Sequence, residues 1–241
     1  MLPVSSHSGD PVAQELREAG VPLGACGKPI GPGSKVSHVA ADDRDGARDM
    51  VRHPLSLGRR RIGVVTGPPD TPGGAERLAG YREVLTEAGV AVDERLIVSG
   101  DYSRAGGEAG AERLLARAPG TDAVFVASDL MAQGVLTARR RAGRRVPQDV
   151  AVGGFDDSPA VVAVSPAADD HPAAVGPDQR GDGAGAAHAD RREDPAAVIL
   201  PTELVKRAST QRGPARDGEP RQRARQLVRI EEAVHRSPGL A

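Results

Sequence analysis

The chain has 241 residues, with 32 lysines and arginines against 33 aspartates and glutamates, and a formal net charge of −1 at pH 7. This balance gives no overall attraction to nucleic acid, and a single cysteine, Cys26, excludes an internal disulfide. No run approaches a membrane span and the first residues do not form a signal peptide, so we expect a cytoplasmic protein with no membrane partner.

The first part of the chain, residues 1–58, predicts a short α/β segment. Two helices and two strands are expected there: helices over 11–19 and 44–57, and strands over 21–23 and 36–41. Asp42 or Asp43 caps the second helix. Pro54 lies inside it, which predicts a kink or an early stop, or else marks a damaging substitution.

From Arg61 onward, strands and helices alternate regularly. The strands are expected over 62–66, 96–98, 123–127 and 150–153, and the helices over 74–88, 104–118 and 129–142. Such alternation is typical of an α/β fold with a doubly wound parallel sheet.

Polar side chains lie on or just after the loops that follow these strands. In a doubly wound sheet the carboxyl ends of the strands meet at one edge, where ligands bind. The candidate ligand-binding residues at this edge are Arg77, Tyr102, Ser128, Asp129 and Asp156. The alternatives are that Asp129 only caps its helix, that Tyr102 is ordinary packing and that Arg77 is a surface charge.

Five segments, in order, resemble the effector-binding core of lactose-repressor/galactose-repressor (LacI-type) transcription regulators. They read GRRRIGVVTGP, RLAGYREVLTEAGV, VFVASDLMAQGVL, RRVPQDVAVGGFDDSP and VILPTELVKRAST. The resemblance implies a type I periplasmic-binding-protein fold, with two α/β subdomains around a cleft and usually a homodimer. It also implies a small-molecule effector, often a sugar or nucleoside, whose binding changes the grip of an N-terminal helix-turn-helix on operator DNA.

The resemblance also implies roles for individual residues. Arg77 matches the arginine that hydrogen-bonds ligand hydroxyls, and Asp156 matches the acceptor for sugar hydroxyls. Ser128, next to Asp129, occupies the place of a polar pocket residue, and Tyr102 lies where an aromatic ring often stacks on the sugar.

The resemblance also divides the chain into parts. The expected parts are a partial N-subdomain over 1–58, a C-subdomain over 59–166 and the closing strand of the C-subdomain over 193–210. The DNA-reading headpiece and the first half of the N-subdomain are not expected in this sequence. Specific operator binding by this chain is therefore not expected. Dimerisation is in doubt for a different reason, because the family's segment that corresponds to residues 167–192 would carry dimer contacts.

Residues 167–192 depart from the family, because apolar periodicity vanishes there and Gly, Ala, Asp and Arg dominate. A linker is one interpretation. Reading the codons one base out of register permits LTTTRPPWDQISAEMARVLLTQ, which resembles the family's segment, so our hypothesis is a frameshift, either a sequencing error or gene decay. Residues 211–241 are expected to form a basic tail, either solvated or an amphipathic helix.

Other chemistry finds little support in the sequence. The six histidines are scattered and have no cysteine partners, so we expect no metal site, no cofactor and no enzyme. The favoured function is a sugar-sensing regulator core. The alternatives are a non-functional gene fragment and, ranked lower, a transport-type sugar-binding protein.

Overall fold

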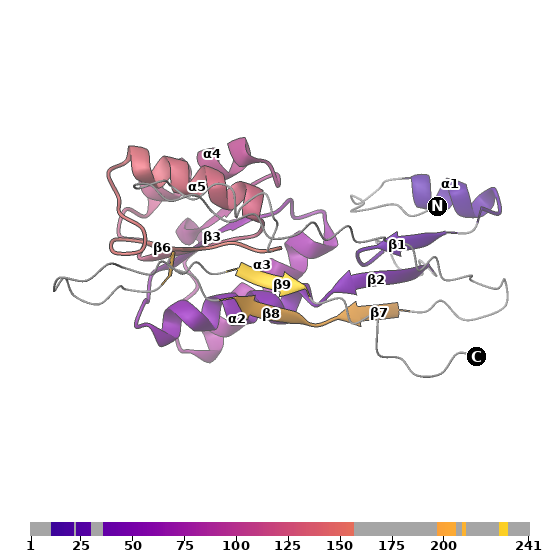
Figure 1. The fold of residues 1–241 in the computed structure, drawn as a ribbon, viewed down its shortest axis with the longest axis horizontal. Helices are drawn as coiled ribbons and strands as arrows, with labels where there is room; N and C mark the ends of the chain where they lie inside the picture. The colour runs from indigo at the N-terminus through magenta and orange to yellow at the C-terminus, as the bar shows by residue number, and fades with distance from the viewer. Residues whose placement is uncertain are drawn as a thin grey trace, which may run out of the picture.

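The computed structural model describes residues 11–21, 23–29, 36–156, 197–205, 209–210 and 227–230 (Figure 1). The helices there are α1 (Val12–Glu18), α2 (Asp43–Ser56), α3 (Pro72–Glu87), α4 (Arg104–Arg117) and α5 (Asp129–Arg141), with a 3-10 turn at Glu94–Leu96. The strands are β1 (Gly24–Cys26), β2 (Ser37–Ala41), β3 (Ile62–Thr66), β4 (Ile97–Ser99), β5 (Ala123–Val126), β6 (Ala151–Gly153), β7 (Ala197–Leu200), β8 (Thr202–Val205) and β9 (Leu227–Ile230).

The main sheet has the strand order β4-β3-β5-β6, and all its pairs are parallel. The chain moves from β3 outward to β4, then returns to the other side of β3 to form β5 and β6. The order therefore reverses between β3 and β5, and in open α/β sheets ligands bind beyond the carboxyl ends of the strands at such a point. The predicted α/β fold with parallel sheets is confirmed.

Helices cover both faces of the main sheet, with α4 and α5 on one side and α2 and α3 on the other (Figure 1). Alternation along β3 explains the two layers, because Val65 packs with α4 and α5 while Ile62 and Val64 pack with α2 and α3. Tyr81 of α3 is fully buried in the second layer and donates from Oη to Ile62 O over 2.7 Å.

A second parallel sheet, of order β1-β2-β7, lies at the other end of the molecule (Figure 1). The strand expected over 21–23 is wrong by a few residues, since the strand begins at Gly24. Between Ala19 and Gly24 the backbone first closes the end of α1, where Val21 N–H donates to Leu16 O.

Two described parts of the predicted closing strand, 197–200 and 209–210, contact different sheets. β7 pairs with β2, whereas Ser209 O accepts from Val152 N of β6 over 2.9 Å. β8 pairs antiparallel with β9, so 227–230 form a strand rather than part of an amphipathic helix. The division into subdomains stays a prediction. Residues 157–196, which include the proposed frameshift, lie outside the described residues.

The early stop expected from Pro54 does not occur, because α2 runs to Ser56. Pro54 lies in the last turn, and the helix ends two residues after it, at Ser56. After it, the Leu57 N–H donates to His53 O and Pro54 O over 3.2 and 3.1 Å.

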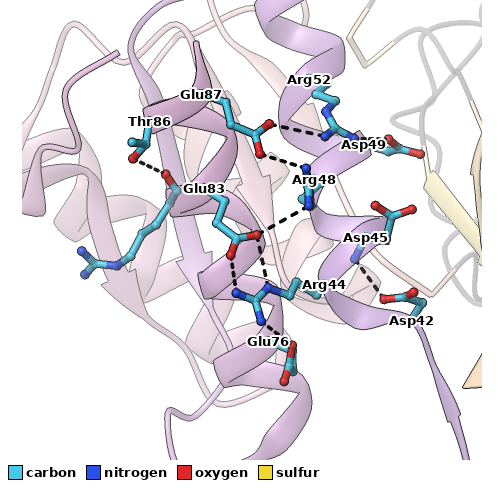
Figure 2. A network of polar contacts seen from close by, with 11 residues as sticks. Asp42, Arg44, Asp45, Arg48, Asp49, Arg52, Glu76, Glu83, Thr86 and Glu87 are labelled. Atoms are coloured by element: carbon cyan, nitrogen blue, oxygen red, sulfur yellow. Dashed lines mark hydrogen bonds and ion pairs between the residues drawn. The ribbon is translucent and has the colours of Figure 1, made fainter. Parts of the chain in front are cut away.

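A row of ion pairs joins α2 to α3 on the surface (Figure 2). Arginines every four residues on α2 face glutamates on α3. The pairs are Arg44 with Glu76 and Glu83, Arg48 with Glu83 and Glu87, and Arg52 with Glu87. The same two helices carry Asp43 and Arg77, one on each.

Glu83→Gln is expected to lower the midpoint of thermal unfolding slightly at neutral pH. The Arg44 guanidinium holds the pKa of Glu83 below its ordinary value of 4.5, so this stabilisation is present above that value and is lost as the pH falls through the lowered pKa. Calorimetry should show the difference shrink in about 1 M salt, where the Debye length is ~3 Å. Glu112→Gln, on the exposed face of α4, is the control, and an equal loss there would contradict the prediction.

Candidate functional site

Arg77 lies at the point where the strand order of the main sheet reverses. It extends from α3, and its Nη1 donates to the carbonyl of Ala127, the residue that follows β5. Thr71 is the N-cap of α3, and its Oγ1 accepts the Gly74 N–H over 3.3 Å. This cap stabilises the first turn of the helix that carries Arg77.

Two carboxylates hold the Arg77 guanidinium. Asp43 Oδ1 accepts from Nε over 2.9 Å and from Nη2 over 2.8 Å, and Asp156 Oδ1 lies 3.4 Å from Nη2. The buried ring of Phe155 covers one face, with its centroid 3.8 Å from Arg77 Cζ, a cation–π contact. The side chains of Arg77 and Asp43 are each 12% exposed, so Arg77 is not an ordinary surface charge.

Asp156 follows β6 and is the most accessible acid of this group, with 40% of its side chain exposed. Surrounding protein raises the pKa of Asp156 by desolvation, Arg77 acts in the opposite direction, and the nearby Asp43 carboxylate raises it further. The backbone N–H of Asp129 also donates to this carboxylate. Asp156 is therefore a fixed acceptor that still faces water.

Tyr102 lies after β4 on the same edge. Its Oη is 3.3 Å from Thr71 Oγ1, and a Cβ added at Gly67 would come within 2.2 Å of the ring. Two non-glycine residues of the described chain have positive φ, and they are Tyr102 (64°) and Asp156 (100°). Such backbone strain is concentrated at ligand-binding sites.

Ser128, rather than Asp129, caps α5. Ser128 Oγ accepts the Met131 N–H over 3.3 Å, and Ser128 is 5% exposed. The alternative that Asp129 is only a helix cap is therefore wrong. Asp129 occupies the first position of α5, is 1% exposed and touches the site through its backbone.

The structure brings Arg77 and Asp156 into contact and places Ser128 and Asp129 beside them. Sequence reasoning missed Asp43 and Phe155 as members of the group. The doublet Asp42-Asp43 held a signal, because only one of two adjacent aspartates can cap a helix. Asp42 does so by accepting from Asp45 N over 3.1 Å, which leaves Asp43 for Arg77.

Among the described residues, no cluster of three or more His, Cys, Asp or Glu side chains could hold a metal ion. In the same part of the chain, every helix is too short or too polar to cross a membrane.

Comparison with known proteins identifies similar chains. The model of the periplasmic binding protein-like domain matches residues 51–210. The HTH-type transcriptional regulator CelR of Thermobifida fusca is 48% identical over 159 residues, which are 66% of this chain and 47% of CelR. The HTH-type transcriptional regulator DegA of Bacillus subtilis (strain 168) is 31% identical over 211 residues, covering 86% of this chain and 61% of DegA. The chain thus spans about half the length of these relatives.

Solved structures are similar as well. A complex of the transcriptional regulator CelR with cellobiose superimposes with a TM-score of 0.70 at 34% identity, covering 86% of this chain and 64% of the other. A LacI-family regulatory protein from Chloroflexus aggregans gives a TM-score of 0.61 at 30% identity, covering 68% and 58% of the two chains.

Proposed function

Since the chain belongs to the periplasmic binding protein-like family and is a LacI-type effector-binding core, we propose that it binds a small polyhydroxylated effector beside Arg77 and Asp156. The observation that carries the proposal is the Arg77–Asp156 pair at the reversal of strand order, where the Nη2 of Arg77 lies 3.4 Å from Oδ1 of Asp156.

The chemistry of this pair suits a sugar. A hydroxyl group both donates and accepts, so it can donate to the Asp156 carboxylate and accept from a guanidinium N–H. Hydrogen bonds that involve an ionised group are the stronger ones, which suits recognition of an uncharged ligand. Tyr102 and Ser128 lie on the same edge and supply further polar or aromatic contacts.

The CelR–cellobiose complex supports a sugar as the effector. The names of the relatives support a role in transcription regulation, in which effector binding here changes operator binding through a helix-turn-helix elsewhere in the regulator. Sensing rather than catalysis is the activity that we assign to the site.

Thermal unfolding with and without sugars tests the proposal. A panel of cellobiose, glucose, galactose and ribose is expected to contain a sugar that raises the midpoint, because a ligand at a hundredfold excess over its Kd adds about 2.7 kcal/mol. If the midpoint does not rise with any of these sugars, or no cooperative transition occurs, the non-functional gene fragment becomes the better account.

Asp156→Asn is expected to weaken binding of the best sugar by about tenfold, since a hydrogen bond to a charged group is worth about 1.5–3 kcal/mol. Asparagine keeps the size of the side chain and tolerates the positive φ at this position. Asp45→Asn, an equal charge change on the exposed side of α2, is the control. Titration calorimetry of both variants measures the effect, and equal affinities would place the ligand away from Asp156.

A further inference from the structure

We propose that Asp43 makes this site selective for uncharged sugars over sugar acids and sugar phosphates, because it occupies the guanidinium edge that an anion would need. The inference rests on the proposed function and names the class of effector that the same site accepts.

Arg77 has little left to offer an anion. A guanidinium has five N–H donors, and carboxylates and phosphates bind best when two parallel donors face them. Asp43 Oδ1 accepts two of these N–H groups, one from Nε and one from Nη2. The second N–H of Nη2 faces Asp156, and one N–H of Nη1 donates to Ala127 O. One N–H of Nη1 therefore remains. Phe155 covers one face of the group. A single Nη1 donor is enough for a hydroxyl but not for a bidentate anion.

The N-termini of α3 and α5, the helices beside Arg77, have some of their N–H groups already occupied. Free N–H groups at the start of a helix attract phosphates and carboxylates. At α5, however, Ser128 Oγ accepts from Met131 N, and Asp156 accepts from Asp129 N. At α3, Thr71 Oγ1 accepts from Gly74 N.

The net charge of the group is also unfavourable for an anion. Asp43 and Asp156 carry two negative charges against the single positive charge of Arg77. Two further cations already pair with carboxylates of α3, since Lys28 lies 3.6 Å from Glu76 and Arg44 pairs with Glu76 and Glu83. An anionic effector would meet an uncompensated carboxylate, whereas a neutral sugar would find acceptors for its hydroxyl protons.

Asp43→Asn tests whether Asp43 itself causes the selectivity, as distinct from a general effect of the negative charge of the protein. Titration calorimetry on the intact chain compares cellobiose and glucose with cellobiose 6-phosphate, glucose 6-phosphate and glucuronate. The unmodified protein is expected to bind the anionic probes at least about tenfold more weakly than the matching neutral sugar. Asp43→Asn is expected to reduce that ratio by about tenfold, because the amide holds Arg77 less firmly and carries no charge. Asp45→Asn, in the same first turn of α2, is expected to leave the ratio unchanged.

The outcomes distinguish this inference from the proposed function. Equal binding of neutral and anionic sugars by the unmodified protein, or tighter binding of the anionic ones, would overturn the selectivity while supporting an effector site. An equal change in Asp43→Asn and Asp45→Asn would overturn the role of Asp43. If no probe binds and no sugar of the thermal-unfolding panel raises the midpoint, the proposed function is contradicted and the inference falls with it.

Salt gives a second test that needs no variant. Repulsion between an anionic probe and the site is screened by added salt, so the affinity for glucose 6-phosphate should rise with ionic strength while that for glucose stays constant. A fall in glucose 6-phosphate affinity with salt would show an attractive site and overturn the proposal.

Discussion

Replacing Arg139 with leucine is expected to raise the free energy of unfolding by about 3 kcal/mol. Arg139 lies in the last turn of α5 and is 0% exposed. Within the described residues, none of its three guanidinium nitrogens has a hydrogen-bond partner. Desolvation and the nearby Arg144 lower the pKa of Arg139 from its ordinary value to about 10, which corresponds to about 3 kcal/mol of unfavourable free energy in the charged form.

The control for Arg139→Leu is Arg140→Leu, one residue further on the exposed side of the same helix. Surface substitutions of this kind change stability by about 0.5 kcal/mol or less. Urea unfolding of both variants measures the difference. A loss of stability in Arg139→Leu would show that the guanidinium is paired in solution and would contradict the prediction.

Replacing Gly107 with alanine is expected to lower the free energy of unfolding by about 2 kcal/mol. Gly107 lies where α4 crosses α5, and an added Cβ would come within 2.1 Å of Met131 O and 2.5 Å of Met131 Cα. Those are backbone atoms, so the helices would have to separate. Alanine favours a helix by about 1 kcal/mol over glycine, and the clash must exceed that gain.

Gly73→Ala is the matched control, since Gly73 is also helical but an added Cβ would meet its nearest atoms at 3.4–3.8 Å. We expect this variant to keep or slightly increase stability, because helix propensity acts without a clash. Thermal unfolding of the two variants makes the comparison. If Gly107→Ala proves as stable as Gly73→Ala, the close crossing of α4 and α5 is not a requirement of the fold.

The architecture could be predicted because each strand of the main sheet is a short apolar run rich in β-branched residues. β3 was predicted over 62–66 and spans Ile62–Thr66, and β5 and β6 were predicted to within one residue at either end. Strand order and partners depend on contacts between distant residues. The pairing of β7 with β2 and of β8 with β9 therefore had no local signal.

The site was predicted only in part, for a similar reason. A loop after a strand identifies an edge of the sheet, which was enough to nominate Arg77 and Asp156. It does not identify the partner that arrives from another helix, so Asp43 was interpreted as a possible cap. Arg139 was missed because the run Arg139-Arg140-Arg141 resembles a solvated helix end, although Val135 and Ala138 place position 139 beside the apolar face.

The most direct test of the account is a crystal structure of this chain with the sugar that raises its unfolding midpoint the most. We predict that hydroxyl groups of that sugar lie within about 3.2 Å of the Asp156 carboxylate and the Arg77 guanidinium, with Asp43 still bound to Arg77. A sugar bound elsewhere on the chain, or one that displaces Asp43 from Arg77, would contradict the site and its proposed selectivity.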